Sequence, residues 1–88
     1  MLYYAALKGT TMMNEHYELA FQSKEGEEIL RTSDSFDNLC DYLEDLLSAD
    51  EDDGKIIIDD MEFSVEEGRI RRLVKLDNGE YYTIRISF

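Results

Sequence analysis

The chain has 88 residues, of which 43% are hydrophobic and ten are aromatic, and its formal net charge is −12. This size and composition predict one small domain with its own core, and the regular apolar spacing excludes a disordered protein. No apolar run approaches the ~20 residues that cross a bilayer, so a membrane-spanning protein is excluded too. The single cysteine, Cys40, excludes an internal disulfide, and no signal peptide is recognisable. We therefore expect a cytoplasmic protein.

Residues 1–12 have two interpretations. Met12 and Met13 are alternative start positions, and either would make the preceding residues an upstream extension. The apolar run at residues 2–7 (LYYAAL) is also compatible with an additional edge strand. The sequence leaves both interpretations open.

The first predicted elements form a β-hairpin. Residues 17–21 (YELAF) place apolar side chains at alternate positions, which is typical of a half-buried strand. Residues 23–27 (SKEGE) carry turn-forming side chains, and residues 28–32 (EILRT) provide the returning strand.

A helix follows the hairpin. Its apolar residues fall within one arc of roughly 120°, the width of a stripe that faces a core. They are Phe36, Leu39, Cys40, Leu43, Leu46 and Leu47. Asp34 or Ser35 is expected to cap the first exposed amides, and the helix is expected to end near Ser48. The acids that follow would then lie in a loop.

The last third of the chain predicts three strands, at residues 56–65, 70–76 and 81–88. With the hairpin and the helix, they give an α+β domain in the order ββαβββ. We expect a single, mostly antiparallel sheet with one amphipathic helix packed on one of its faces.

The turn between the first two of these strands sets their register. A two-residue Glu67-Gly68 turn keeps the apolar side chains mostly on one face. It pairs Met61 with Val74, Phe63 with Arg72, and Val65 with Ile70. Arg72 is the exception, because it points toward the apolar face, at the end of the sheet or toward a carboxylate of the helix.

The turn between the last two strands favours a three-residue loop. A two-residue Asn78-Gly79 turn would mix the two faces of the sheet, whereas a three-residue loop with Gly79 in a left-handed conformation does not. The longer loop pairs Val74 with Tyr82 and Ile70 with Ile86.

Charge is distributed unevenly along the chain. Residues 34–67 hold fourteen acidic residues and one basic residue, Lys55, whereas residues 68–88 have a net positive charge. On the helix, neighbouring acids at i,i+3 and i,i+4 spacing repel one another by roughly 0.2–0.5 kcal/mol per pair. Folding alone would not favour this arrangement.

We therefore predict that the acids bind a positively charged partner. A solvated face that keeps the protein soluble is the alternative interpretation. The candidate partner-binding residues are Asp37, Asp41, Glu44, Asp45, Asp50, Glu51, Asp52, Asp53, Asp59 and Asp60. A basic groove built for nucleic acid would suit them, because carboxylates along the helix are spaced about as closely as the ~3.4 Å between phosphates of one DNA strand.

No catalytic or cofactor site is predicted. Cys40 lies on the apolar stripe and is expected to be a small hydrophobic residue, and His16 has no nucleophile nearby in the sequence. Residues 49–60 have the glycine of a calcium-binding EF-hand loop, but Ala49 occupies the position that requires an acid. We expect no enzyme and no cofactor, and a small metal-binding protein is the weakest alternative.

In size, acidity and helix-plus-sheet layout, the chain resembles the small acidic inhibitors of phages and mobile elements, which include anti-CRISPR proteins and DNA mimics. It is similar in the same way to the acidic immunity proteins that neutralise basic toxins. These families share no common motif, so no residue roles are transferred. The resemblance implies a monomeric or homodimeric inhibitor that binds the basic surface of a nucleic-acid-binding protein, with no direct contact to nucleic acid or membrane.

Overall fold

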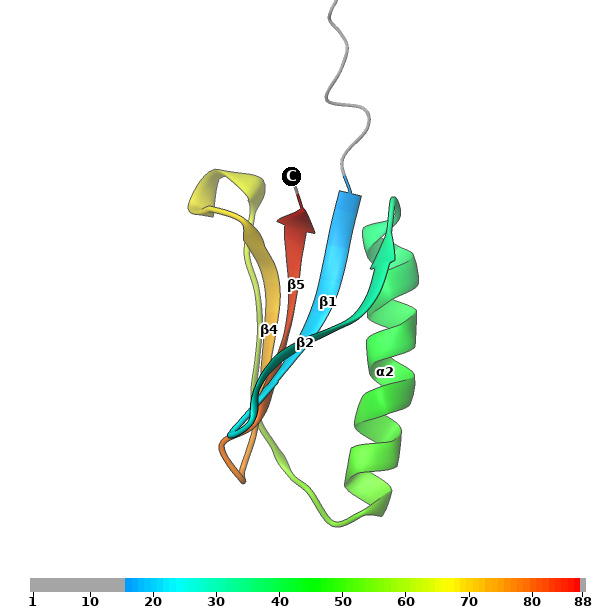
Figure 1. Ribbon diagram of the computed structural model, residues 1–88, viewed down its shortest axis with the longest axis vertical. Coiled ribbons are helices and arrows are strands. Elements are labelled where there is room, and N and C mark those ends of the chain that lie inside the picture. The colour runs from blue at the N-terminus through cyan, green and yellow to red at the C-terminus, as the bar shows by residue number, and fades with distance from the viewer. Residues whose placement is uncertain (1–15, 88) are drawn as a thin grey trace, which may run out of the picture.

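The computed structural model describes residues 16–87, so the two interpretations of residues 1–12 lie outside the described part. The described elements confirm the predicted α+β order ββαβββ (Figure 1). They are β1 (His16–Ser23), β2 (Gly26–Ser33), α2 (Phe36–Asp52), β3 (Ile57–Glu62), the short 3-10 helix η2 (Val65–Glu67), β4 (Ile70–Leu76) and β5 (Tyr81–Ser87).

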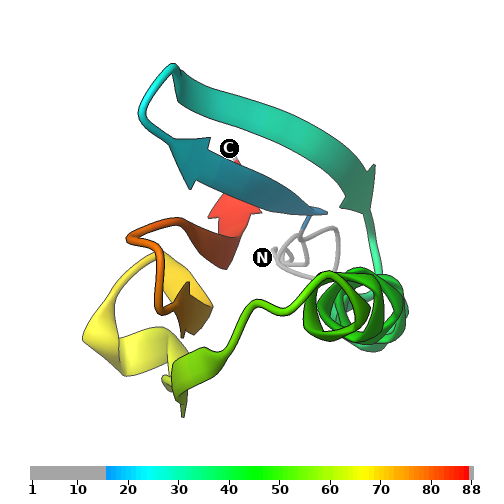
Figure 2. The same ribbon diagram turned by 90° about the horizontal axis from the view of Figure 1, so that it is seen from below.

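The five strands form one sheet in the order β2-β1-β5-β4-β3, and every neighbouring pair is antiparallel. The strands β2 and β3 are the two edges, and α2 connects them. The helix packs over β1, β2 and β5 on one side of the sheet, which we call the helix face (Figure 2). The opposite side is called the open face.

The core lies between α2 and the helix face. Leu39, Leu43 and Leu47 recur every four residues, so one side of the helix supplies three buried side chains. The strands supply the other buried apolar residues of this cluster, which are Tyr17, Leu19, Val74, Leu76, Tyr82, Ile84 and Ile86. The predicted apolar stripe is thus the side of α2 that faces the sheet.

Ser35 caps the helix, as one of the two predicted residues. Its Oγ accepts a hydrogen bond of 3.2 Å from the Asn38 N–H, which satisfies an amide left open by the first turn. The predicted end near Ser48 is wrong, because the helix continues to Asp52. It ends where Gly54 adopts a positive φ of 89°, a conformation that glycine takes at little cost.

The predicted register between β3 and β4 is wrong by one residue. Met61 lies opposite Leu73, and Glu62 lies opposite Arg72. The connection contains the 3-10 helix η2, in which the Glu67 carboxylate accepts bonds of 3.1 Å from the N–H and Oγ of Ser64. A tight two-residue turn is therefore not formed. Because side chains alternate along a strand, the shift moves Met61 to the open face and turns Glu62 toward the helix face.

The three-residue loop between β4 and β5 is confirmed. Gly79 has a φ of 91°, the Leu76 N–H donates to the Glu80 carbonyl at 2.9 Å, and Val74 lies opposite Tyr82. The predicted partner of Ile70 is wrong: Ile70 lies opposite Arg85, because a bulge interrupts the start of β4.

Candidate functional site

Six exposed acids lie on the side of α2 that points away from the core. At 100° per residue they occupy an arc of about 120°, and they extend over ~22 Å of helix length. We call them the acidic face, and they are Asp37, Asp41, Glu44, Asp45, Glu51 and Asp52. The helix contains no basic residue that would offset their charge.

One buried arginine connects the acidic face to the edge strand β3. The Nη2 of Arg72 donates to Glu44 at 2.8 Å and to Asp60 at 2.7 Å, and its Nε donates to Asp60 at 3.0 Å. This confirms that Arg72 points toward a helix carboxylate. Hydrogen bonding to Asp60 and to Glu44 raises the pKa of Arg72 further above its usual range. Glu44 and Asp60 are thus partly neutralised and held side by side.

Asp50 does not belong to the exposed surface. Its side chain is only 13% exposed, and it accepts a hydrogen bond of 2.6 Å from the Tyr82 hydroxyl. Lys55 lies 3.5 Å from Asp50 and 3.3 Å from Glu80, so it bridges the helix end to the last hairpin. Burial, together with the neighbouring Asp50, raises the pKa of Tyr82. The role of Asp50 in the described structure is to fix the last turns of α2.

The other predicted acids differ in their surroundings. Asp37, Asp41, Asp45, Glu51, Asp52 and Asp53 are exposed, and none of them forms an ion pair within residues 16–87. Asp53 caps the end of the helix, so the stretch from Asp50 to Asp53 is not the predicted loop. Asp59 is half-buried and lies opposite Lys75 on the open face.

One acid beside the acidic face was not among the predicted binding residues. Glu62 is exposed and lies on the helix face, one alternate position from Asp60. The predicted register assigned this side of β3 to apolar residues, which concealed Glu62. The signal that could have revealed it is the Ser64–Glu67 spacing, which is typical of a capped helical turn and argues against a two-residue hairpin.

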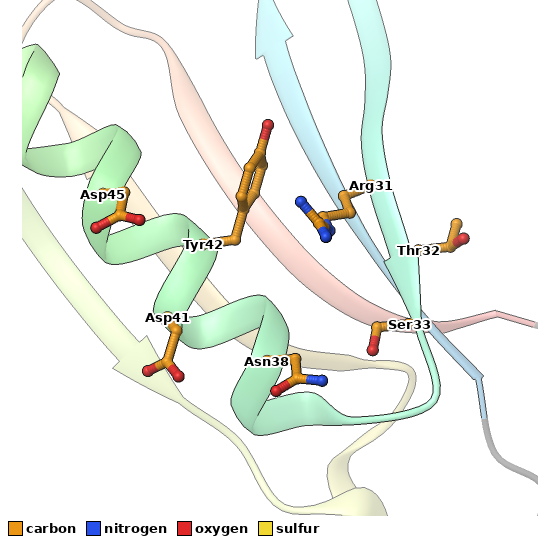
Figure 3. A pocket seen from close by; sticks show the side chains of 7 residues that line it. All are labelled: Arg31, Thr32, Ser33, Asn38, Asp41, Tyr42 and Asp45. Carbon is orange, nitrogen blue, oxygen red and sulfur yellow. The ribbon is translucent and has the colours of Figure 1, made fainter.

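A polar cleft of about 330 Å³ lies between α2 and the edge strand β2 (Figure 3). The Arg31 guanidinium lies 4.8 Å from the centre of the Tyr42 ring, a cation–π distance, so the two side chains bridge the cleft. Asp41 and Asp45 line its outer rim, and in Figure 3 both point away from β2. The cleft is therefore bordered by the acidic face.

The open face carries a second charged group, in which both acids are paired with the same arginine. Arg85 donates to Glu18 at 2.6 Å and to the two oxygens of Glu27 at 2.7 and 2.9 Å. The bidentate bond lowers the pKa of Glu27. The open face thus differs from the acidic face, whose outermost carboxylates lack such a cation among the described residues.

His16 and Cys40, the two other reactive side chains considered above, have the following surroundings. His16 contacts Asp34, and both are exposed. Cys40 is half-buried, and burial raises the pKa of its thiol, which disfavours the reactive thiolate. Among the described residues, no group of three histidine, cysteine or acidic side chains is arranged to hold a metal ion.

Comparisons with protein-family models, curated proteins and solved structures find no match to this chain. In the part of the chain that the structure describes, no helix combines the length and apolarity needed to span a membrane.

Proposed function

We propose that the protein is a non-enzymatic binding module that inhibits a nucleic-acid-handling protein by occupying its basic surface. The acidic face of α2 is the observation that carries this proposal. It aligns six exposed acids along one side of a helix that has no basic residue. The partner's lysines and arginines would meet these carboxylates in place of the phosphates of a nucleic acid.

The spacing of the charges supports the comparison with nucleic acid. Six carboxylates over ~22 Å give one negative charge per ~4 Å of helix, close to the ~3.4 Å per phosphate of a single DNA strand. Opposite charges on two such surfaces would also speed their association, by roughly 10–1,000-fold at low salt.

The charge repulsion along α2 also supports a basic partner. Asp41 has acidic neighbours at i−4, i+3 and i+4, and each such pair opposes helix formation by about 0.2–0.5 kcal/mol. Glu51 and Asp52 lie at the negative end of the helix dipole, where an acid costs another ~0.3–1 kcal/mol. A basic partner would convert this repulsion into attraction on binding.

The helix presents these charges on a rigid support. Its opposite side is anchored by Leu39, Leu43 and Leu47, all of which are buried, and its first turn is capped by Ser35. Little order would have to be imposed on the backbone during binding, which limits the entropic cost of forming a complex.

The test is capture of the partner and measurement of its salt dependence. The full chain, immobilised and incubated with nuclease-treated lysate of the natural host, is expected to retain a basic nucleic-acid-binding protein that high salt releases. The purified partner should lose affinity for its nucleic acid when the chain is added, in direct competition. A captured basic toxin would instead favour the immunity-protein alternative.

A pair of neutralising variants makes the test specific. Asp41→Asn with Asp45→Asn is expected to weaken binding, because two central carboxylates are lost. The matched control is Glu28→Gln with Glu66→Gln, which removes the same charge from exposed positions outside α2. Equal affinity of both pairs for the partner would show that only net charge matters and would remove the acidic face as the binding site.

A further inference from the structure

The outer edge of β3 presents unpaired backbone groups. The Phe63 N–H donates to the Arg71 carbonyl at 2.9 Å, so the backbone of Phe63 points toward β4. In an antiparallel ladder the direction alternates at each residue, and Glu62 and Asp60 therefore direct their N–H and C=O groups away from β4. No strand within residues 16–87 pairs with this side of β3. Such an edge is a template for one more strand.

Two exposed isoleucines stand at the beginning of this edge. Ile56 is 60% exposed and Ile58 is 62% exposed, the highest values among the large apolar side chains described. The backbone of Ile56 is nevertheless fixed: its N–H donates to the Asp77 carboxylate at 3.2 Å, and its carbonyl accepts from the Asp77 N–H at 2.9 Å. Exposed apolar side chains on a fixed backbone are typical of a contact surface.

The charge on β3 selects the kind of strand that can pair there. All three ionisable residues of β3 are acidic, namely Asp59, Asp60 and Glu62. If two copies of this chain paired through β3, Asp60 and Glu62 of one copy would lie opposite the same acids of the other. Like charges directly across a strand pair are destabilising, and each chain carries a charge of −12. Self-pairing is therefore disfavoured, and a basic strand is complementary.

The same strand is physically joined to the acidic face. Glu44 of α2 and Asp60 of β3 bind the same Nη2 atom of Arg72, so the two acidic elements are neighbours. The other edge strand, β2, is less suited, because Arg31 is exposed there beside Tyr42.

We propose that the outer edge of β3 binds an extended, basic segment of the partner as a sixth strand. Backbone hydrogen bonds to Asp60 and Glu62 hold the segment, its lysines or arginines face the acids, and its apolar residues pack on Ile56 and Ile58. This inference rests on the proposed function, because it describes how the partner of the acidic face is held.

The test uses three synthetic peptides with the full chain. The first alternates lysine and valine, the second alternates lysine and serine, and the third is the lysine–valine peptide with alternate backbone amides N-methylated, which blocks strand pairing at equal charge. Affinities are measured by calorimetry. Amide hydrogen exchange of the isotope-labelled protein is followed by NMR at Asp60 and Glu62, whose N–H groups point outward.

The lysine–valine peptide is expected to slow exchange at Asp60 and Glu62 by roughly tenfold or more, as burial in a ladder does. The N-methylated peptide should leave exchange unchanged, and the lysine–serine peptide should bind more weakly. Replacing Ile56→Ser together with Ile58→Ser should reduce lysine–valine binding by roughly 10–100-fold, since the burial of each isoleucine contributes up to about tenfold. The matched control is Ile29→Ser with Ile70→Ser, at positions that are 44% and 41% exposed.

Failure of this proposal is distinguishable from failure of the proposed function. Unchanged exchange at Asp60 and Glu62 under saturating peptide, or absence of binding altogether, would overturn strand addition. If the peptide binds without changing this exchange, and Asp41→Asn with Asp45→Asn weakens its binding, the acidic face is supported as a binding site and the β3 edge is not. Slowed exchange with no effect of the helix variants would support the β3 edge and contradict the acidic face.

Discussion

The repulsion along α2 can be measured without any partner, by replacing Asp41→Lys. Asp41 is exposed and lies one turn from Asp37, Glu44 and Asp45, so the change converts three unfavourable neighbours into three favourable ones. Each pair changes by about 0.4–1 kcal/mol between repulsion and attraction, which gives a total of roughly 1–3 kcal/mol of added stability. We expect the lower part of this range, because Glu44 is already bound to Arg72.

The assay is urea unfolding at low salt and at about 1 M salt, where screening shortens the range of charge interactions to ~3 Å. The free energy of unfolding should rise in the variant at low salt, and most of the gain should disappear at high salt. For a domain of this size, ~1 kcal/mol corresponds to an increase of roughly 4–8 °C in the melting temperature.

The matched control is Glu28→Lys, which changes the net charge equally at an exposed position on β2. An equal gain in both variants would mean that the helix acids oppose folding only through the total charge of the chain. A variant that is no more stable than the original would refute the premise that the acidic face is retained at a cost, and the proposed function would lose its energetic support.

Three further predictions follow from individual contacts. Replacing Arg72→Met should destabilise the fold by about 1–3 kcal/mol in urea unfolding, less than for a fully buried pair, because both carboxylate partners can regain water. For Tyr82, whose pKa is raised above its ordinary value of 10, stability is fully present below pH 10 and is lost as the pH rises toward the folded pKa, because the unfolded chain releases the proton first. Tyr82→Phe, which removes the hydrogen bond to Asp50, should be less stable than the original at neutral pH, and the difference should narrow above pH 10. Calorimetric titration with calcium should show no binding heat, because the acids of residues 50–53 follow a helix and its cap instead of converging in a loop; a clear heat would revive the metal-binding alternative.

The elements of the fold were predictable because their determinants are local. The spacing of Leu39, Leu43 and Leu47 identifies a helix and its buried side, and a cap at Ser35 identifies its beginning. The end of the helix was not predictable, because the Tyr82 hydroxyl reaches Asp50 from 32 residues further along the chain and Lys55 joins Asp50 to Glu80 of the last hairpin. Those tertiary contacts stabilise a turn that local charge disfavours.

The candidate site, too, was predictable only in part. The acidic face depends only on the helical period, so Asp37, Asp41 and Asp45 fall where the sequence predicts. Which acids of β3 lie beside the acidic face depends on the strand register. A change of one residue in the turn moves every side chain of the strand to the opposite face of the sheet. Glu62 was missed for this reason, while the orientation of Arg72 was predicted because its own position in β4 was assigned to the correct face.

The strand order has a consequence for how the protein is made. The neighbouring strands β1 and β5 come from opposite ends of the described chain, with Tyr17 opposite Ile86. While the polypeptide is being synthesised, β1 can pair with β2 and β3 can pair with β4, but the two halves of the sheet can join only after the last strand has left the ribosome. Folding is therefore expected to be completed only after β5 has been synthesised, at a rate limited by this distant pairing.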